Sequence, residues 1–188
     1  MNRSSFNMIS FGFLFLIIDF RIQNFDILPD IIGYILFAVG FHALTPYSEY
    51  FRKASHVNIP LLVGSILDIY KFPASAPSQA GGVSFDFGAF GFLAIPIIIA
   101  ICVLSILAVY FMFQGIIEMA LTKGLGSLAD EAGRRWKEYL YLQIAILFSF
   151  IVIFLPVIGI AYIIALAIIS LIIIFAIMRF MRVCGENL

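Results

Sequence analysis

The chain has 188 residues, of which 63% are hydrophobic and 12% are charged, and its mean hydropathy is +1.12. A soluble domain cannot hide that much apolar side chain, because even a fold of about 300 residues leaves roughly a quarter of its unfolded surface in water. Lipid is therefore the expected solvent, and the balance of eleven basic against eleven acidic residues gives no reason to expect a nucleic-acid partner.

The first two apolar segments predict membrane spans over about residues 4–21 and 28–44. No small-x-small cleavage site follows the first segment, so we expect it to be retained rather than removed as a signal peptide. A polar turn, DFRIQNFDILPDIIG, joins the two spans. Pro29 suits the first turn of the second helix, which Thr45-Pro46 then ends.

The third segment, about 54–70, is the least regular because it contains His56, Asn58 and Pro60. It fits either a kinked span packed against protein or a re-entrant helix at the interface. A stretch rich in Pro, Ser, Gly and Ala follows over 72–85, which is typical of a loop.

The second half predicts three further spans, about 90–117, 136–155 and 156–178. Before the second of these, Glu131 and Arg135 stand four residues apart, which favours a short surface helix over 122–138. Trp136 then begins an aromatic belt where the chain re-enters lipid. No charge occurs from Tyr139 to Met178, and Pro156 supplies the break between the last two spans.

These segments predict an all-α polytopic membrane protein, a single transmembrane domain over 1–188 with six helices arranged as three hairpins. Six spans place both termini on one side, together with nine of the eleven basic residues; Arg21 and Lys71 fall on the other side. This positive-inside bias predicts that both termini are cytoplasmic.

Acidic residues gather on the opposite, outer side. We expect a candidate ligand-binding group there, made of Asp19, Arg21, Asp26, Asp30, Asp68 and Asp86. The same residues also fit a structural interpretation, in which Asp26 and Asp30 cap the second span, Asp19 pairs with Arg21, and Asp68 pairs with Lys71.

Other chemistry lacks its residues. His42 and His56 have no partners at metal-ligand spacing, no cofactor is implied, and hydrolase, metalloprotease, nucleotide-binding and thiol-redox motifs are missing, so we expect no enzyme. Glu118 is the one deep acid that a lipid-modifying enzyme could use. Gln143 and Ser149 suit hydrogen bonds between helices, and Cys102 and Cys184 are expected to be free thiols.

A weak internal repeat has an offset of 67 residues, with Asp19, Pro29 and Ile31 falling on Asp86, Pro96 and Ile98. It fits either repeated helix hairpins or the general frequency of proline in the first turn of membrane helices.

The segment DFRIQNFDILPDIIGY, followed by EYFRKA at 49–54, resembles an uncharacterised family of small multi-span membrane proteins of Gram-positive bacteria. The resemblance implies a bacterial cytoplasmic membrane and no particular activity. The chain is also similar in size and span number to the substrate-binding subunits of energy-coupling-factor transporters, although Phe11-Gly12-Phe13 replaces the small residues that those proteins carry in span 1.

The sequence thus favours a solute-binding or transport-type component with an Asp-rich outer face. The alternative is a non-catalytic accessory protein that assembles with another membrane protein or with itself. In both cases the lipid bilayer surrounds the chain.

Overall fold

The computed structural model describes residues 2–17, 21–22, 25–26, 30–69, 91–152 and 156–188. These residues form six α-helices, a single turn of 3-10 helix at Thr45–Tyr47, and two strands of two residues each, β1 (Arg21–Ile22) and β2 (Phe25–Asp26). The helices are α1 (Asn2–Ile17), α2 (Asp30–Leu44), α3 (Glu49–Ile69), α4 (Gly91–Thr122), α5 (Gly126–Val152) and α6 (Pro156–Asn187). The predicted all-α class is confirmed.

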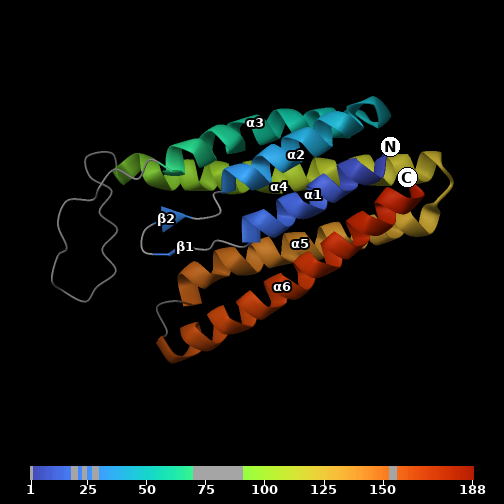
Figure 1. The fold of residues 1–188 in the computed structure, drawn as a ribbon. Helices are drawn as coiled ribbons and strands as arrows, with labels where there is room; N and C mark the ends of the chain where they lie inside the picture. The colour runs from blue at the N-terminus through green and yellow to red at the C-terminus, as the bar shows by residue number, and fades with distance from the viewer. Residues whose placement is uncertain (1, 18–20, 23–24, 27–29, 70–90, 153–155) are drawn as a thin grey trace.

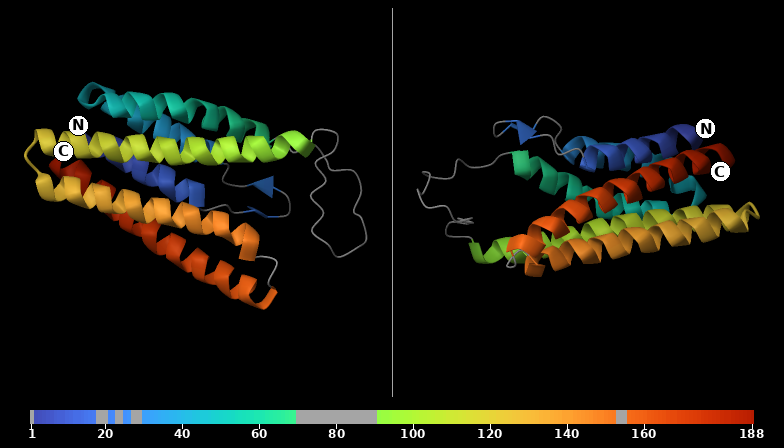
Figure 2. Two further views of the ribbon diagram at one scale, coloured as in Figure 1. Left: turned by 180° about the vertical axis from the view of Figure 1, so that it is seen from behind. Right: turned by 90° about the horizontal axis from the view of Figure 1, so that it is seen from below.

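The six helices form a ring. Each helix packs against the next one in the chain, and α6 returns to pack against α1 (Figures 1 and 2). The expected hairpins are present as neighbouring pairs, α1 with α2, α3 with α4, and α5 with α6. Because the last helix meets the first, the ring encloses a centre toward which all six helices turn a face.

Glycines bring α1 and α2 close together. A Cβ atom on Gly40 would lie 2.6 Å from the Ile9 Cγ1 atom, and one on Gly12 would lie 2.6 Å from the Phe37 ring. Gly33 likewise faces Leu16 at 2.9 Å. Small residues at helix contacts let backbones approach closely, which is the usual packing device where lipid removes the hydrophobic driving force.

The end of the bundle that holds both termini has a dense apolar core. Its largest fully buried side chains include Phe6, Phe41, Phe51, Met112, Phe113, Ile116, Ile177 and Met181, and α5 adds the fully buried Ala132. The Phe37 and Phe41 rings stack with centroids 5.4 Å apart. This end of the ring is therefore closed by side chains.

Four helices extend beyond the predicted boundaries. α3 begins at Glu49 rather than near 54, α4 ends at Thr122 rather than near 117, α5 begins at Gly126 rather than near 136, and α6 ends at Asn187 rather than near 178. α3 runs without interruption through Pro60, which is exposed. α5 begins at Gly126, because Arg135 pairs with Glu131 (3.2 Å) and Glu138 (2.8 Å) and carries the helix across the predicted boundary. The expected separate surface helix over 122–138 is thus the last turn of α4 and the first part of α5.

The turn between α4 and α5 is set by Gly124, whose φ of 72° suits glycine. Its N–H donates to Leu121 O (3.0 Å), and the N–H of Leu125 donates to Ala120 O (2.8 Å). This is the Schellman pattern, in which the two bonds satisfy carbonyls left open at a helix end.

Two helices are long and apolar enough to cross a membrane among the residues that the structure describes, α4 over Ile99–Thr122 and α6 over Gly159–Asn187. The described parts of α1 and α2 have 16 and 15 residues, fewer than the about 20 that a bilayer core requires. By length and composition, two helices of the described part of the chain can thus cross a membrane, and the other four predicted spans are not established on this measure.

Candidate ligand-binding cavity

The sequence-predicted acidic group lies in part at one end of the bundle, away from both termini. In the short hairpin, Arg21 pairs with Asp26 in backbone register. Asp30 is the first residue of α2, and Asp68 stands one residue before the end of α3. Asp19 and Asp86 fall outside the described residues. The backbone thus brings Arg21, Asp26, Asp30 and Asp68 to the same end of the ring (Figure 1).

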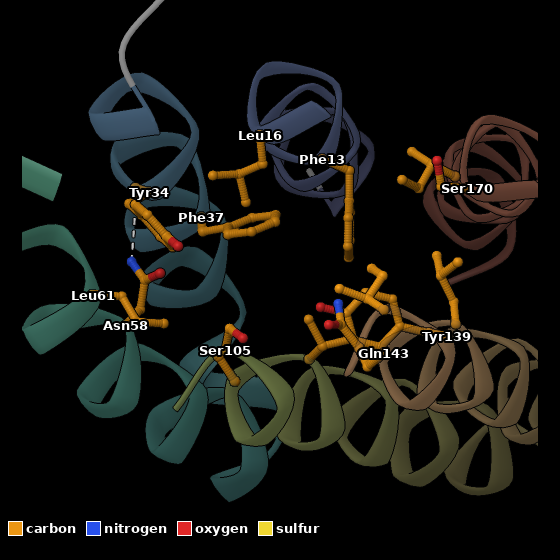
Figure 3. Close-up of a pocket in the computed structure, with 15 residues that line it drawn as sticks. Phe13, Leu16, Tyr34, Phe37, Asn58, Leu61, Ser105, Tyr139, Gln143 and Ser170 are labelled. Carbon is orange, nitrogen blue, oxygen red and sulfur yellow. Dashed lines mark hydrogen bonds between the residues drawn. The ribbon is translucent and has the colours of Figure 1, made fainter. Parts of the chain in front are cut away.

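A cavity of about 280 Å³ lies inside the ring. All six helices contribute to its wall, as Figure 3 shows. Its lining is Phe13, Leu16, Tyr34, Phe37, Asn58, Leu61, Ser105, Ala108, Val109, Tyr139, Leu142, Gln143, Ile146, Ser170 and Ile174. None of these residues carries a charge, so the wall is apolar with a few neutral polar groups.

Asn58 is the most informative of these polar groups. Its side chain is fully buried, and its Nδ2 atom donates to the backbone oxygen of Tyr34 over 2.8 Å (Figure 3). Because a carbonyl can only accept, this bond fixes the nitrogen toward α2 and turns Oδ1 the other way. Oδ1 has no hydrogen-bond partner among the described residues. A buried acceptor in that state costs about 1–3 kcal/mol.

Two serines add acceptors of the same kind. The Ser105 hydroxyl donates to Cys102 O and the Ser170 hydroxyl to Ala167 O, both over 2.8 Å. Each hydroxyl proton is thereby used within its own helix, and only oxygen lone pairs remain. Together with Asn58 Oδ1, they place acceptors on a wall that also carries the Gln143 amide and two tyrosine hydroxyls, which can donate.

Aromatic rings form much of the remaining wall. The Phe13 ring meets Phe37 edge-on with centroids 5.0 Å apart and meets Tyr139 at 6.4 Å. The Tyr139 hydroxyl is hydrogen-bonded to Gln143, one turn further along α5. The cavity is therefore bounded by flat apolar surfaces.

Several residues singled out in the sequence lie elsewhere. His42 and His56 are exposed, and His56 Nδ1 is 2.7 Å from Arg52 O. Glu118, expected to be a deep acid, is exposed and accepts a hydrogen bond from Ser48 near the closed end. Cys102 and Cys184 are free thiols, as predicted. Burial, and to a smaller extent the charge of Glu131, raises the pKa of Cys184.

Partial signals for the cavity are present in the sequence. Asn58 and Gln143 stood out as polar residues in apolar segments, but each also fitted a structural role. Tyr139 was expected in the aromatic belt that begins at Trp136, whereas it is buried and lines the cavity. Tyr34, Ser105 and Ser170 were not singled out, because tyrosine and serine are common in membrane helices and their spacing does not show that they line one cavity. These residues line the same cavity only because α6 packs against α1 and closes the ring.

No protein-family model, curated protein or solved structure matches this chain. The functional argument therefore depends on the cavity itself. A concave, mostly apolar space with a few oriented polar groups is the usual form of a small-molecule site.

Proposed function

We propose that this chain is a multi-pass protein of a bacterial cytoplasmic membrane that works as a solute-binding or transport-type component. All six helices cross the bilayer with both termini in the cytoplasm. The central cavity holds the solute, and the acidic end forms the outer face. Binding rather than catalysis is the activity.

The outer surface of the ring supports six spans. Every helix exposes large apolar side chains, which are Phe11, Ile35, Val39, Ile59, Val63, Ile99, Val103, Leu107, Ile144, Leu147, Phe148, Ile160, Ile164, Ile168, Ile172 and Phe175 among others. α3 also inverts the order of a soluble helix, since Asn58 and Ser65 face inward while Ile59 and Val63 face outward. Lipid is the solvent that this arrangement fits.

The distribution of basic residues supports the orientation. The ends of α1, α3, α4, α5 and α6 that meet beside the termini hold Arg3, Arg52, Lys53, Lys123, Arg134, Arg135, Lys137, Arg179 and Arg182. Positively charged residues mark the cytoplasmic side of membrane proteins. The acidic end then faces outward.

The unpaired Oδ1 atom of Asn58 is the observation that carries the binding proposal. Native structures satisfy at least about nine in ten of their buried polar groups, so an orphan in a cavity needs a reason. A bound molecule that donates a hydrogen bond supplies that reason. The dense core toward the termini leaves the acidic end as the direction of entry.

The test is recovery of a bound molecule. Protein purified from its membrane in a mild detergent is denatured, and the released small molecules are identified by mass spectrometry. We expect a stoichiometric compound from the wild type and loss of that compound from N58L. S149A is the matched control, because Ser149 also donates to its own helix (Ile146 O, 2.6 Å) but does not line the cavity. Equal recovery from wild type and N58L would overturn the proposal.

A second function, assembly with another membrane protein or a second copy, is favoured by one observation on α6. Ala161 and Ala165 form a small-xxx-small spacing, and both are exposed in the described part of the chain. Chemical cross-linking in native membranes tests it. A higher-mass species that A165L removes would support assembly, and a purely monomeric band in wild type would exclude it.

A further inference from the structure

We infer that the molecule held in the cavity is neutral, about the size of a bicyclic aromatic ring, and carries an N–H or O–H donor that bonds to Asn58 Oδ1. This inference rests on the proposed binding function and names the class of ligand. It follows from the size, the polarity and the charge of the wall.

Size sets the first limit. An apolar protein cavity of about 150 Å³ binds benzene, a ring of six carbon atoms. The cavity described here has about 280 Å³, close to twice that volume. A ligand of about ten to twelve non-hydrogen atoms therefore fits, which is two fused rings rather than one ring or a large cofactor.

Polarity sets the second limit. Asn58 Oδ1 is an unpaired acceptor, and the hydroxyl protons of Ser105 and Ser170 are already used by backbone oxygens. A ligand that brings only acceptors would leave Asn58 Oδ1 unpaired, whereas a ligand with one or two donors can pair with it.

Charge sets the third limit. No lining residue is acidic, basic or a histidine. An ion in this space would lose its hydration without a countercharge, which costs far more than leaving a neutral polar group unpaired. The rings of Phe13, Phe37 and Tyr139 instead suit the flat faces of a neutral aromatic molecule.

Indole and 1-methylindole make a matched pair of probes. Both are bicyclic, but methylation removes the only donor and makes the molecule more hydrophobic. We measure ligand-dependent thermal shifts of the detergent-purified full chain, after exchange of any resident molecule, against a concentration series of each probe. Partition into the detergent micelle favours 1-methylindole, whereas the cavity chemistry favours indole.

Indole is expected to bind about tenfold more tightly than 1-methylindole to the wild type. N58L should reduce this preference to less than twofold, and the double variant S105A/S170A should reduce it partly, which keeps the test usable if N58L folds poorly. S149A should leave it unchanged. Equal or tighter binding of 1-methylindole by the wild type would overturn the donor requirement.

Charged relatives of the probe complete the test. Tryptamine, a cation at neutral pH, and indole-3-acetate, an anion, should each bind at least tenfold more weakly than indole. Tighter binding of tryptamine would show that the aromatic wall takes an organic cation and would overturn neutrality. If no probe binds and no resident molecule is recovered, the binding function itself fails; if a charged or donor-free molecule binds, only the ligand class fails.

Discussion

Asn58 on α3 donates its side-chain amide to the backbone oxygen of Tyr34 on α2 over 2.8 Å, and its buried amide oxygen is left beside the cavity without a partner among the described residues. One side chain thus links two helices and leaves one acceptor unpaired. The arrangement is unfavourable for stability and useful for binding. The first prediction separates these two effects.

N58L should stabilise the ligand-free protein. The substitution removes an orphan acceptor that costs about 1–3 kcal/mol and gives up one hydrogen bond worth about 1 kcal/mol, while the leucine buries apolar surface of similar shape. We expect an increase in the free energy of unfolding of about 1 kcal/mol, measured by denaturant titration of detergent-purified protein stripped of small molecules. If the free energy of unfolding of N58L is instead lower than that of the wild type by more than about 1 kcal/mol, Asn58 has a structural role.

G40A should destabilise the contact between α1 and α2. The added Cβ would lie 2.6 Å from Ile9 Cγ1 and 3.1 Å from Ser5 O, and neither helix has room to withdraw in the buried contact. We expect a loss of about 1–3 kcal/mol in unfolding free energy. G64A is the control, because a Cβ on Gly64 meets nothing within 4 Å.

The free energy of unfolding of G64A should rise by up to about 1 kcal/mol, because alanine is a better helix former than glycine. If G40A and G64A behave alike, the close approach of α1 and α2 is not what stabilises the ring.

Cys184 should make the protein less stable as the pH rises above about 8.5, the ordinary value for a thiol. Burial raises the pKa of Cys184 in the folded state, so its neutral form is favoured there. Below about pH 8.5 this contribution is fully present; above it, the unfolded chain gains stability by releasing the proton. Thermal unfolding of wild type and C184A from pH 7 to 10 measures the effect.

The difference between the two proteins should narrow toward pH 10 if the thiol is responsible. If the unfolding midpoints of wild type and C184A fall in parallel as the pH rises, groups other than Cys184 cause the loss of stability at alkaline pH. C102A serves as the control for the second thiol, which is only partly buried.

Orientation is tested by cysteine labelling in intact cells. Single cysteines at D26C, in β2, and at R134C, near the start of α5, are introduced into a chain that lacks Cys102 and Cys184. A membrane-impermeant maleimide should label D26C directly and R134C only after permeabilisation. The reverse pattern would place the acidic end in the cytoplasm.

The helical framework could be predicted from the sequence because apolar run length and charge carry that information directly. Spans 28–44 and 156–178 begin within two residues of α2 and α6. The boundary at 122–138 was wrong for a local reason. The ion pair of Glu131 and Arg135 that suggested a separate surface helix lies inside one helix, α5, which continues to Val152. Charge pairs four residues apart show helicity, but they do not show where a helix ends.

The candidate site was harder to predict. Acidic residues attract attention in an apolar sequence, and Asp30 and Asp68 do lie at one end of the ring. The cavity depends instead on neutral residues, of which Ser105 and Ser170 are ordinary in a membrane helix. Ser105 and Ser170 each donate to a backbone oxygen of their own helix and line the same cavity. That shared position depends on how the six helices pack, which a short stretch of sequence does not show.

The contact between α6 and α1 also sets an order of events during synthesis. Until α6 docks on α1, the other five helices form an open arc, and the wall of the cavity is complete only once that contact forms. Under the proposed function, the ability to hold a solute would therefore arise only at the final step of biogenesis. A chain stalled before α6 would present that open arc to the insertion machinery or to quality-control proteases.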